Sequence, residues 1–211
     1  MASALRTAFR DSPCFHWYKN ISARVDYAWW RTWGTSKPKV PHLVKQMVIQ
    51  EYGRRFKLDT LVETGTNYGH MIYAQKDNFR KIYSIELDEW RAKSAQRKFA
   101  KLPNVEVLRG DSGVVLPKLV PSLKQPCLFW LDGHEFDIST PVKLELAALC
   151  QYPVQGHVLL LDDAHWFDGR SDYPTLDEIR AQIARAYPRH VMEVKDDILR
   201  IYNPAADVRS T

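Results

Sequence analysis

The feature that most constrains the fold is the segment LVETGTNYGH, residues 61–70, in which a short apolar run meets a turn interrupted by Gly65 and Gly69. After the turn, apolar residues such as Met71 and Ile72 no longer alternate and can share one side of a helix. This order of strand, turn and helix predicts the opening of a βαβ unit. Glycine accepts positive φ, and the following helix N-terminus offers N–H groups to a small polar ligand.

The remaining sequence continues this alternation. Buried strands are expected at 58–63, 81–86, 105–108, 127–131 and 157–161. Helices are expected at 42–56, from the end of the glycine turn to about residue 78, at 88–101, at 141–151 and from 175 onward, where Thr175 and Glu178 form a capping-box pattern. Segments 191–194 and 198–202 flank Asp196-Asp197 as a closing antiparallel hairpin. The alternation predicts an α/β fold with a single Rossmann-like, doubly wound, mostly parallel sheet and a C-terminal antiparallel hairpin.

Residues 1–41 differ from the rest because tryptophan and tyrosine alternate there with arginine and lysine, and Pro41 marks a boundary. We therefore divide the chain into a helical, aromatic-rich N-terminal extension, 1–41, and a domain, 42–211. Three interpretations of the extension stay open. It is a lid over a pocket, a cover or dimer contact, or a segment that touches a membrane surface peripherally.

Composition excludes several classes of protein. Hydrophobic residues make up 45% and charged residues 26%, as in a soluble globular chain. The net charge is +5, but basic and acidic residues are interspersed, so no nucleic-acid partner is expected. Three widely spaced cysteines indicate a reducing compartment, and no apolar run reaches the roughly 18 residues of a membrane span. A cytoplasmic location is predicted.

Carboxylates gather where the predicted parallel strands end. Ligands of such sheets bind at the carboxyl ends of the strands. One acid there is an ordinary turn residue, whereas a full set facing one edge indicates a ligand site. The set comprises Glu63, Glu86, Asp111, Asp132, Asp162 and Asp163.

The first two strand ends favour an adenosine-containing ligand without a pyrophosphate. Glu86 lies about 20 residues after Gly65, the spacing at which an acid can bind ribose hydroxyls. The turn lacks the G-x-G-x-x-G pattern that brings the backbone close to a pyrophosphate. An S-adenosyl group needs no such approach, so a nicotinamide-dependent oxidoreductase is disfavoured.

Residues 58–203 resemble the class I S-adenosylmethionine-dependent methyltransferases through ETGTNYG, IYSIE and RGDS, taken in that order. The resemblance implies a methionine-binding turn after the first strand, a ribose-binding acid after the second and an adenine-flanking pair after the third. The implied cofactor-binding residues are Glu63, Gly65, Asn67, Gly69, Glu86, Asp111 and Ser112.

The later motifs LDGHE and LLDDAH are similar to those of metal-dependent O-methyltransferases of the catechol and macrocin (sugar) types. That similarity implies that Asp132, Asp162 and Asp163 hold a divalent cation. Three carboxylates suit Mg²⁺, which prefers oxygen ligands. The alternative is that Asp162-Asp163 only caps the following loop.

The catalytic base is less defined, because the sequence departs from both types after Asp132. His134 stands where the sugar type has a second acid, and it is our first candidate for the base. Its alternatives are a contact with adenine or a turn cap. His165 is the second candidate, and Asp132 completes the predicted catalytic set.

The predicted function is methyl transfer from S-adenosylmethionine to a hydroxyl of a small molecule, such as a sugar, a phenol or a natural product, with a divalent cation. Two alternatives remain: a metal-independent methyltransferase, and a non-catalytic module that binds S-adenosylmethionine or a membrane surface. Acceptor specificity is expected in loops 134–139 and 164–173, where Trp166 and Phe167 either stack on a ring or pack beneath the loop.

Overall fold

The computed structural model describes residues 22, 24–32, 40–133, 140–170 and 172–210. The chain divides into two compact units, Met1–Val48 and Ile49–Thr211, and each is described by itself. Their boundary falls within helix α3 (His42–Arg55), a few residues after the division predicted at residue 41. The functional division into extension and domain stays a prediction.

In the first unit, residues 24–32 are helical. The rings of Tyr27 and Trp30 stack there with centroids 6.4 Å apart, and the neighbouring Trp29 is exposed. The other aromatic residues on which the interpretation of the extension relied, such as Trp17 and Trp33, lie outside the described residues. Among the helices that the structure describes, none is both long and apolar enough to cross a bilayer.

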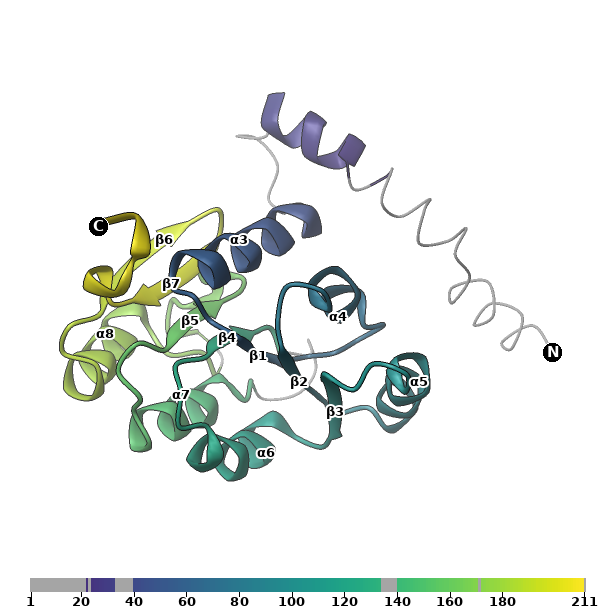
Figure 1. Ribbon diagram of the computed structural model, residues 1–211. Helices are drawn as coiled ribbons and strands as arrows, with labels where there is room; N and C mark the ends of the chain where they lie inside the picture. The colour runs from purple at the N-terminus through teal and green to yellow at the C-terminus, as the bar shows by residue number, and fades with distance from the viewer. Residues whose placement is uncertain (1–21, 23, 33–39, 134–139, 171, 211) are drawn as a thin grey trace. The chain divides into compact units, whose positions relative to one another are not determined.

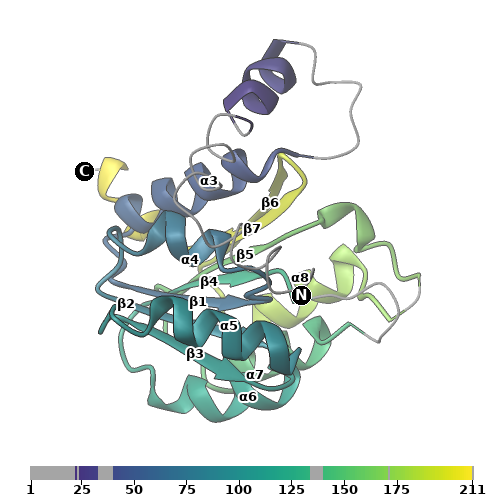
Figure 2. The same cartoon turned by 90° about the vertical axis from the view of Figure 1, so that its right-hand side faces the viewer.

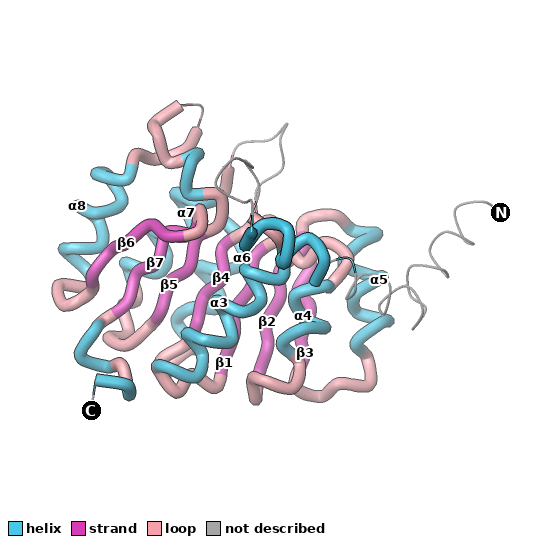
Figure 3. The backbone as a smooth tube through the Cα atoms, turned by 90° about the horizontal axis from the view of Figure 1, so that it is seen from above, coloured by secondary structure: helices cyan, strands magenta, loops and turns pink. Residues whose placement is uncertain are grey.

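The described part of the second unit contains one seven-stranded sheet in the order β3-β2-β1-β4-β5-β7-β6, visible from above in Figure 3. Strands β1 to β5 pair in parallel, and β7 joins β5 and β6 in antiparallel pairs. The predicted fold class is therefore confirmed. The strands are β1 (Thr60–Thr64), β2 (Lys81–Glu86), β3 (Val105–Arg109), β4 (Leu128–Leu131), β5 (Val158–Leu161), β6 (Val191–Lys195) and β7 (Ile198–Tyr202).

Helices cover both faces of this sheet (Figures 1 and 2). Buried side chains of α6, α7 and α8 form one core cluster with residues such as Val62 and Phe129 of the sheet. Helices α4 and α5 contribute buried residues outside that cluster, as expected for the opposite face. The helices are α4 (His70–Gln75), α5 (Glu89–Phe99), α6 (Ser112–Leu119), α7 (Val142–Gln151) and α8 (Leu176–Ala186), with short 3₁₀ turns η2 (Val120–Ser122), η3 (Ala164–Trp166), η4 (Pro204–Ala206) and η5 (Val208–Ser210).

Local sequence explains most element ends. Thr175 and Glu178 form the predicted capping box at the start of α8. Asp196 and Asp197 both have positive φ, 54° and 56°, which suits the tight turn of the β6–β7 hairpin. Helix α4 ends at Gln75, about a turn earlier than predicted. Because β1 to β5 are parallel, their carboxyl ends lie along one edge of the sheet.

Candidate functional site

The turn after β1 is built on Gly65, which has a φ of 85°. Its N–H donates to the carbonyl of Ile85 at 2.9 Å. A Cβ atom at this position would lie 2.2 Å from the carbonyl oxygen of Asp132. Both the backbone angle and the close approach to the end of β4 therefore require glycine.

Glu63, at the end of β1, is a fully buried carboxyl group. Burial is the main reason that the pKa of Glu63 is raised to about 8; the negative charges of Asp132 and Glu86 contribute to the rise, and a hydrogen bond from Ser84 opposes it. The Ser84 hydroxyl donates to the Glu63 carboxyl at 2.5 Å and also meets the Thr66 hydroxyl at 2.6 Å. The site is thus rich in acid, and a positively charged ligand would relieve the repulsion.

Glu86 lies at the end of β2, where two backbone groups fix its carboxylate. The N–H of Asn67 donates to one oxygen at 2.6 Å and the N–H of Asp88 donates to the other at 3.0 Å. Burial raises the pKa of Glu86, and these two hydrogen bonds oppose that effect. A carboxylate has about four acceptor positions, so its remaining lone pairs suit the paired hydroxyls of a ribose.

The end of β3 joins the same edge. The N–H of Gly110 donates to the carbonyl of Glu86 at 2.8 Å. Asp111 caps α6 by accepting from the N–H of Gly113 at 2.8 Å, and Ser112 is buried in the first turn. Hydrogen bonds therefore connect the loops after β1, β2 and β3 into one continuous edge.

Gly69 has a different reason to be glycine. Its φ is 71°, and a Cβ atom there would lie 2.5 Å from the ring of Phe99 on α5. Packing of α5 against the start of α4 therefore accounts for this residue. A ligand contact is not required to explain it.

The three predicted metal ligands lie together beside this edge. Asp132 follows β4, and Asp162 and Asp163 follow β5. The N–H of Asp162 donates to the carbonyl of Leu131, the last residue of β4, at 3.0 Å. One carboxylate oxygen from each acid lies within 4.8 Å of the others. Asp162 is buried, with 1% exposure, which a loop-capping role does not require. An oxygen-only set with three acids fits a hard divalent cation such as Mg²⁺.

Tyr173 is a site residue that its sequence position did not single out. Burial raises the pKa of Tyr173, a hydrogen bond with Thr140 opposes the rise, and the negative charges of Asp163 and Asp132 add to it. Its phenol is therefore near enough to Asp132 and Asp163 for their charges to act on it. The segment was predicted as a specificity loop, but no local pattern distinguishes this tyrosine from its neighbours.

The predicted aromatic pair in this loop separates in the structure. Phe167 is 5% exposed and packs into the core, whereas Trp166 is 38% exposed. The Trp166 ring stacks on Tyr173 with centroids 6.0 Å apart and lies 5.1 Å from the His165 ring. One of the pair therefore packs beneath the loop, and the other is available at the surface.

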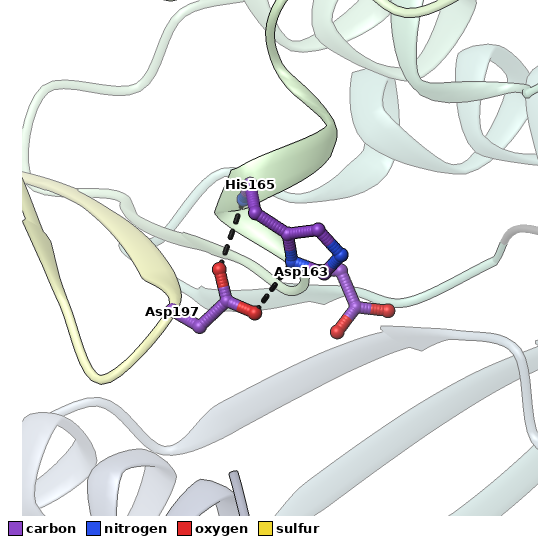
Figure 4. A group of neighbouring side chains, drawn as sticks. All are labelled: Asp163, His165 and Asp197. Carbon is purple, nitrogen blue, oxygen red and sulfur yellow. Dashed lines mark hydrogen bonds and ion pairs between the residues drawn. The ribbon is translucent and has the colours of Figure 1, made fainter. Parts of the chain in front are cut away.

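His165 lies on η3 and contacts Asp197 on the turn of the β6–β7 hairpin (Figure 4). Its ring Nδ1 is 2.6 Å from one Asp197 carboxylate oxygen, and its backbone N–H donates to the other at 2.9 Å. Asp163, His165 and Asp197 also form a second group whose potential ligand atoms lie within 4.8 Å of one another. The sequence identified Asp197 only as a turn residue. His134 lies outside the described residues, so its role stays a prediction.

The sequence matches no model of a known protein family, and no curated protein matches it either. Solved structures do match its fold. A candidate caffeoyl-CoA O-methyltransferase from Staphylococcus aureus is 12% identical, with 94% of this chain and 99% of that chain covered and a TM-score of 0.55.

Two further solved methyltransferases also match the fold of this chain. An S-adenosylhomocysteine-bound methyltransferase from Podospora anserina is 18% identical, with 85% and 87% of the two chains covered and a TM-score of 0.54. The 23S rRNA methyltransferase ErmE is 17% identical, with 77% and 69% covered and a TM-score of 0.51. The chain therefore shares its fold with these methyltransferases, and a fold alone does not establish a function.

Proposed function

We propose that this protein transfers a methyl group from S-adenosylmethionine to a hydroxyl of a small molecule, with a divalent cation. One observation carries the proposal. The glycine turn after β1, the fixed carboxylate of Glu86 and the Asp111 loop form a hydrogen-bonded edge, and three clustered acids follow it on β4 and β5. Solved methyltransferases of the same fold support this interpretation.

The donor would bind along the first three strand ends. Glu86 would accept the ribose hydroxyls, and Asp111 with Ser112 would flank the adenine. Gly65 holds the turn close against the end of β4, where the methionine part would bind, and the acid-rich surroundings of Glu63 would suit its positive sulfonium and ammonium groups.

Asp132, Asp162 and Asp163 would hold the cation. A bound divalent cation would lower the pKa of the acceptor hydroxyl and orient its oxygen. The side chains around it would position the acceptor: Trp166 and Tyr173 offer stacked rings beside the carboxylates. Alignment of donor and acceptor can account for roughly 7–11 kcal/mol of the barrier.

Two histidines are candidates for the group that receives the hydroxyl proton. His165 lies beside Asp163 and is half-exposed, so a small molecule can reach it. His134, two residues after Asp132 in the sequence, is the second candidate on its sequence position alone. Replacing each by glutamine separates them, because the base should contribute about 10²–10⁴-fold to the rate.

Calorimetry with S-adenosylhomocysteine tests the cofactor site, and the variant Glu86→Gln should weaken its binding at least about tenfold.

Methyl transfer to 3,4-dihydroxybenzoate, with Mg²⁺ or EDTA, tests the cation. We expect turnover with Mg²⁺, none in EDTA, and none in Asp163→Asn. Asp168→Asn, which changes an acid of the same loop that pairs with Arg170, is the matched control and should keep its activity.

The outcomes discriminate between the alternatives. Undiminished turnover in EDTA would identify a metal-independent methyltransferase. Cofactor binding without turnover of any hydroxylated acceptor would indicate a non-catalytic module. If S-adenosylhomocysteine does not bind and the protein sediments with vesicles, the main role lies in the N-terminal extension. The predictions of a lid or a dimer contact are tested with a variant that lacks residues 1–41. Its turnover and its oligomeric state are compared with those of the full chain.

A further inference from the structure

The turn of the β6–β7 hairpin is joined to the segment after β5 by three hydrogen bonds. The N–H of Ala164 donates to the Asp197 carbonyl at 2.8 Å. The two carboxylate oxygens of Asp197 contact His165, one at its backbone N–H and one at ring Nδ1, at 2.9 and 2.6 Å. Backbone and side chain of one turn residue thus both hold this histidine in place.

This arrangement selects one form of the imidazole ring. An ionised carboxylate only accepts hydrogen bonds, so Nδ1 must carry the hydrogen in the contact with Asp197. In the neutral ring Nε2 then has a free lone pair. Figure 4 shows this second nitrogen on the side of the ring away from Asp197, with Asp163 beside the pair.

Exposure supports an outward-facing role for the ring. The His165 side chain is 52% exposed, whereas that of Asp197 is 22% exposed. The carboxylate is thus largely covered, while the ring is open to a ligand. If the His165 ring served only to bind Asp197 through Nδ1, it would need neither its exposed position nor its closeness to Asp163.

We propose that Asp197 is a positioning residue, which holds His165 in the Nδ1–H tautomer and presents Nε2 to the hydroxyl of the methyl acceptor. The proposal rests on the proposed methyl transfer. The hydroxyl oxygen forms a bond to the methyl carbon, and the carbon–sulfur bond breaks with its electrons staying on sulfur. The hydroxyl proton moves to Nε2, and S-adenosylhomocysteine leaves neutral at sulfur.

The variants follow from the backbone of the turn. Asp197 has a φ of 56°, which glycine adopts without strain, so Asp197→Gly removes the carboxylate and keeps the turn. Asp197→Asn keeps the side-chain shape. Because its amide oxygen must accept the backbone N–H of His165, its NH₂ group faces Nδ1 and donates to it, which favours the Nε2–H tautomer. Asp196→Gly is the matched control, because Asp196 has nearly the same φ and contacts Arg200 instead.

Nitrogen-15 NMR of the histidine rings measures the tautomer of His165 without any methyl acceptor. The His165 signals are identified as those that disappear in His165→Gln. We expect the Nδ1–H form in the unaltered protein and in Asp196→Gly, and mainly the Nε2–H form in Asp197→Asn and in Asp197→Gly. An Nε2–H ring in the unaltered protein, or the same tautomer in Asp197→Gly, would overturn the proposal. So would a change of equal size in Asp196→Gly, because the hairpin shape would then be the cause.

Turnover of 3,4-dihydroxybenzoate supplies the second measurement. We expect kcat to fall about 10²-fold in Asp197→Gly while KM and the affinity for S-adenosylhomocysteine stay nearly unchanged. An unchanged kcat overturns the proposal. Nitrogen-15 shifts that respond to added Mn²⁺ or Zn²⁺ at two ions per chain would also overturn it, since Asp197 and His165 would then be ligands of a second cation. Absence of turnover in the unaltered protein, with the expected tautomers, counts against the proposed function alone.

Discussion

Gly65 places a strict local demand on the turn after β1, because its positive φ and the nearby Asp132 carbonyl both exclude a side chain. We expect Gly65→Ala to lower the free energy of unfolding by at least about 2 kcal/mol and to abolish S-adenosylhomocysteine binding. Urea denaturation and calorimetry measure the two effects. Gly156→Ala, also at positive φ but with its nearest contact 3.1 Å away at Pro126, should lose stability and keep its cofactor affinity. Equal losses of affinity in both variants would contradict this account.

Helix α8 depends at its start on the capping box, in which Thr175 accepts from the N–H of Glu178 at 3.1 Å and Glu178 accepts from that of Thr175 at 2.7 Å. Two buried residues of the helix, Ile179 and Ile183, belong to the core. We expect Thr175→Ala to lower the free energy of unfolding by about 1 kcal/mol, and Thr175→Ser to restore most of it. Urea denaturation measures this. A loss of the same size in Thr175→Ser would show that the methyl group, rather than the hydroxyl, stabilises the helix.

Two buried groups shape the pH dependence of the stability of the whole molecule. Burial raises the pKa of Glu63 to about 8, so its contribution is present below about 4.5 and is lost as pH rises toward 8. Burial lowers the pKa of His157 to about 4, so its contribution is present above about 6.5 and is lost as pH falls toward 4. The neutral His157 ring accepts the N–H of Cys127 at 2.9 Å. The pKa of Glu86 is also raised, and that of His190 lowered, by burial.

These opposite slopes nearly cancel between pH 4.5 and 6.5. We therefore expect a broad maximum of the free energy of unfolding there, a decline above pH 6.5 and a decline toward pH 4. Urea denaturation across this range measures it. In Glu63→Gln the decline on the alkaline side should shrink, and in His157→Gln the decline on the acid side should shrink. If both variants keep the original profile, other groups control the pH dependence.

At the level of elements, the sequence alone was sufficient to predict the parallel strands, the closing hairpin and the capping box. Apolar runs such as 127–131 and the caps at Thr175 act over a few residues, so the local pattern contains the information. Helix α4 ended earlier than predicted. The prediction had included Asn78, which lies just beyond the end of the helix. Its side-chain amide donates to the Ala74 carbonyl and to the Gln75 side chain, and so helps to close the last helical turn.

The sequence by itself determined which acids end the strands, because parallel strands of a doubly wound sheet bring their carboxyl ends to one edge whatever the loops do. That reasoning placed Asp132, Asp162 and Asp163 together, and the structure confirms their proximity. Only the tertiary structure decided the partner of His165. Asp197 lies on the turn between β6 and β7, and its contact arises from where this antiparallel hairpin docks against β5. No local periodicity encodes such a contact, since it depends on the packing of the whole sheet.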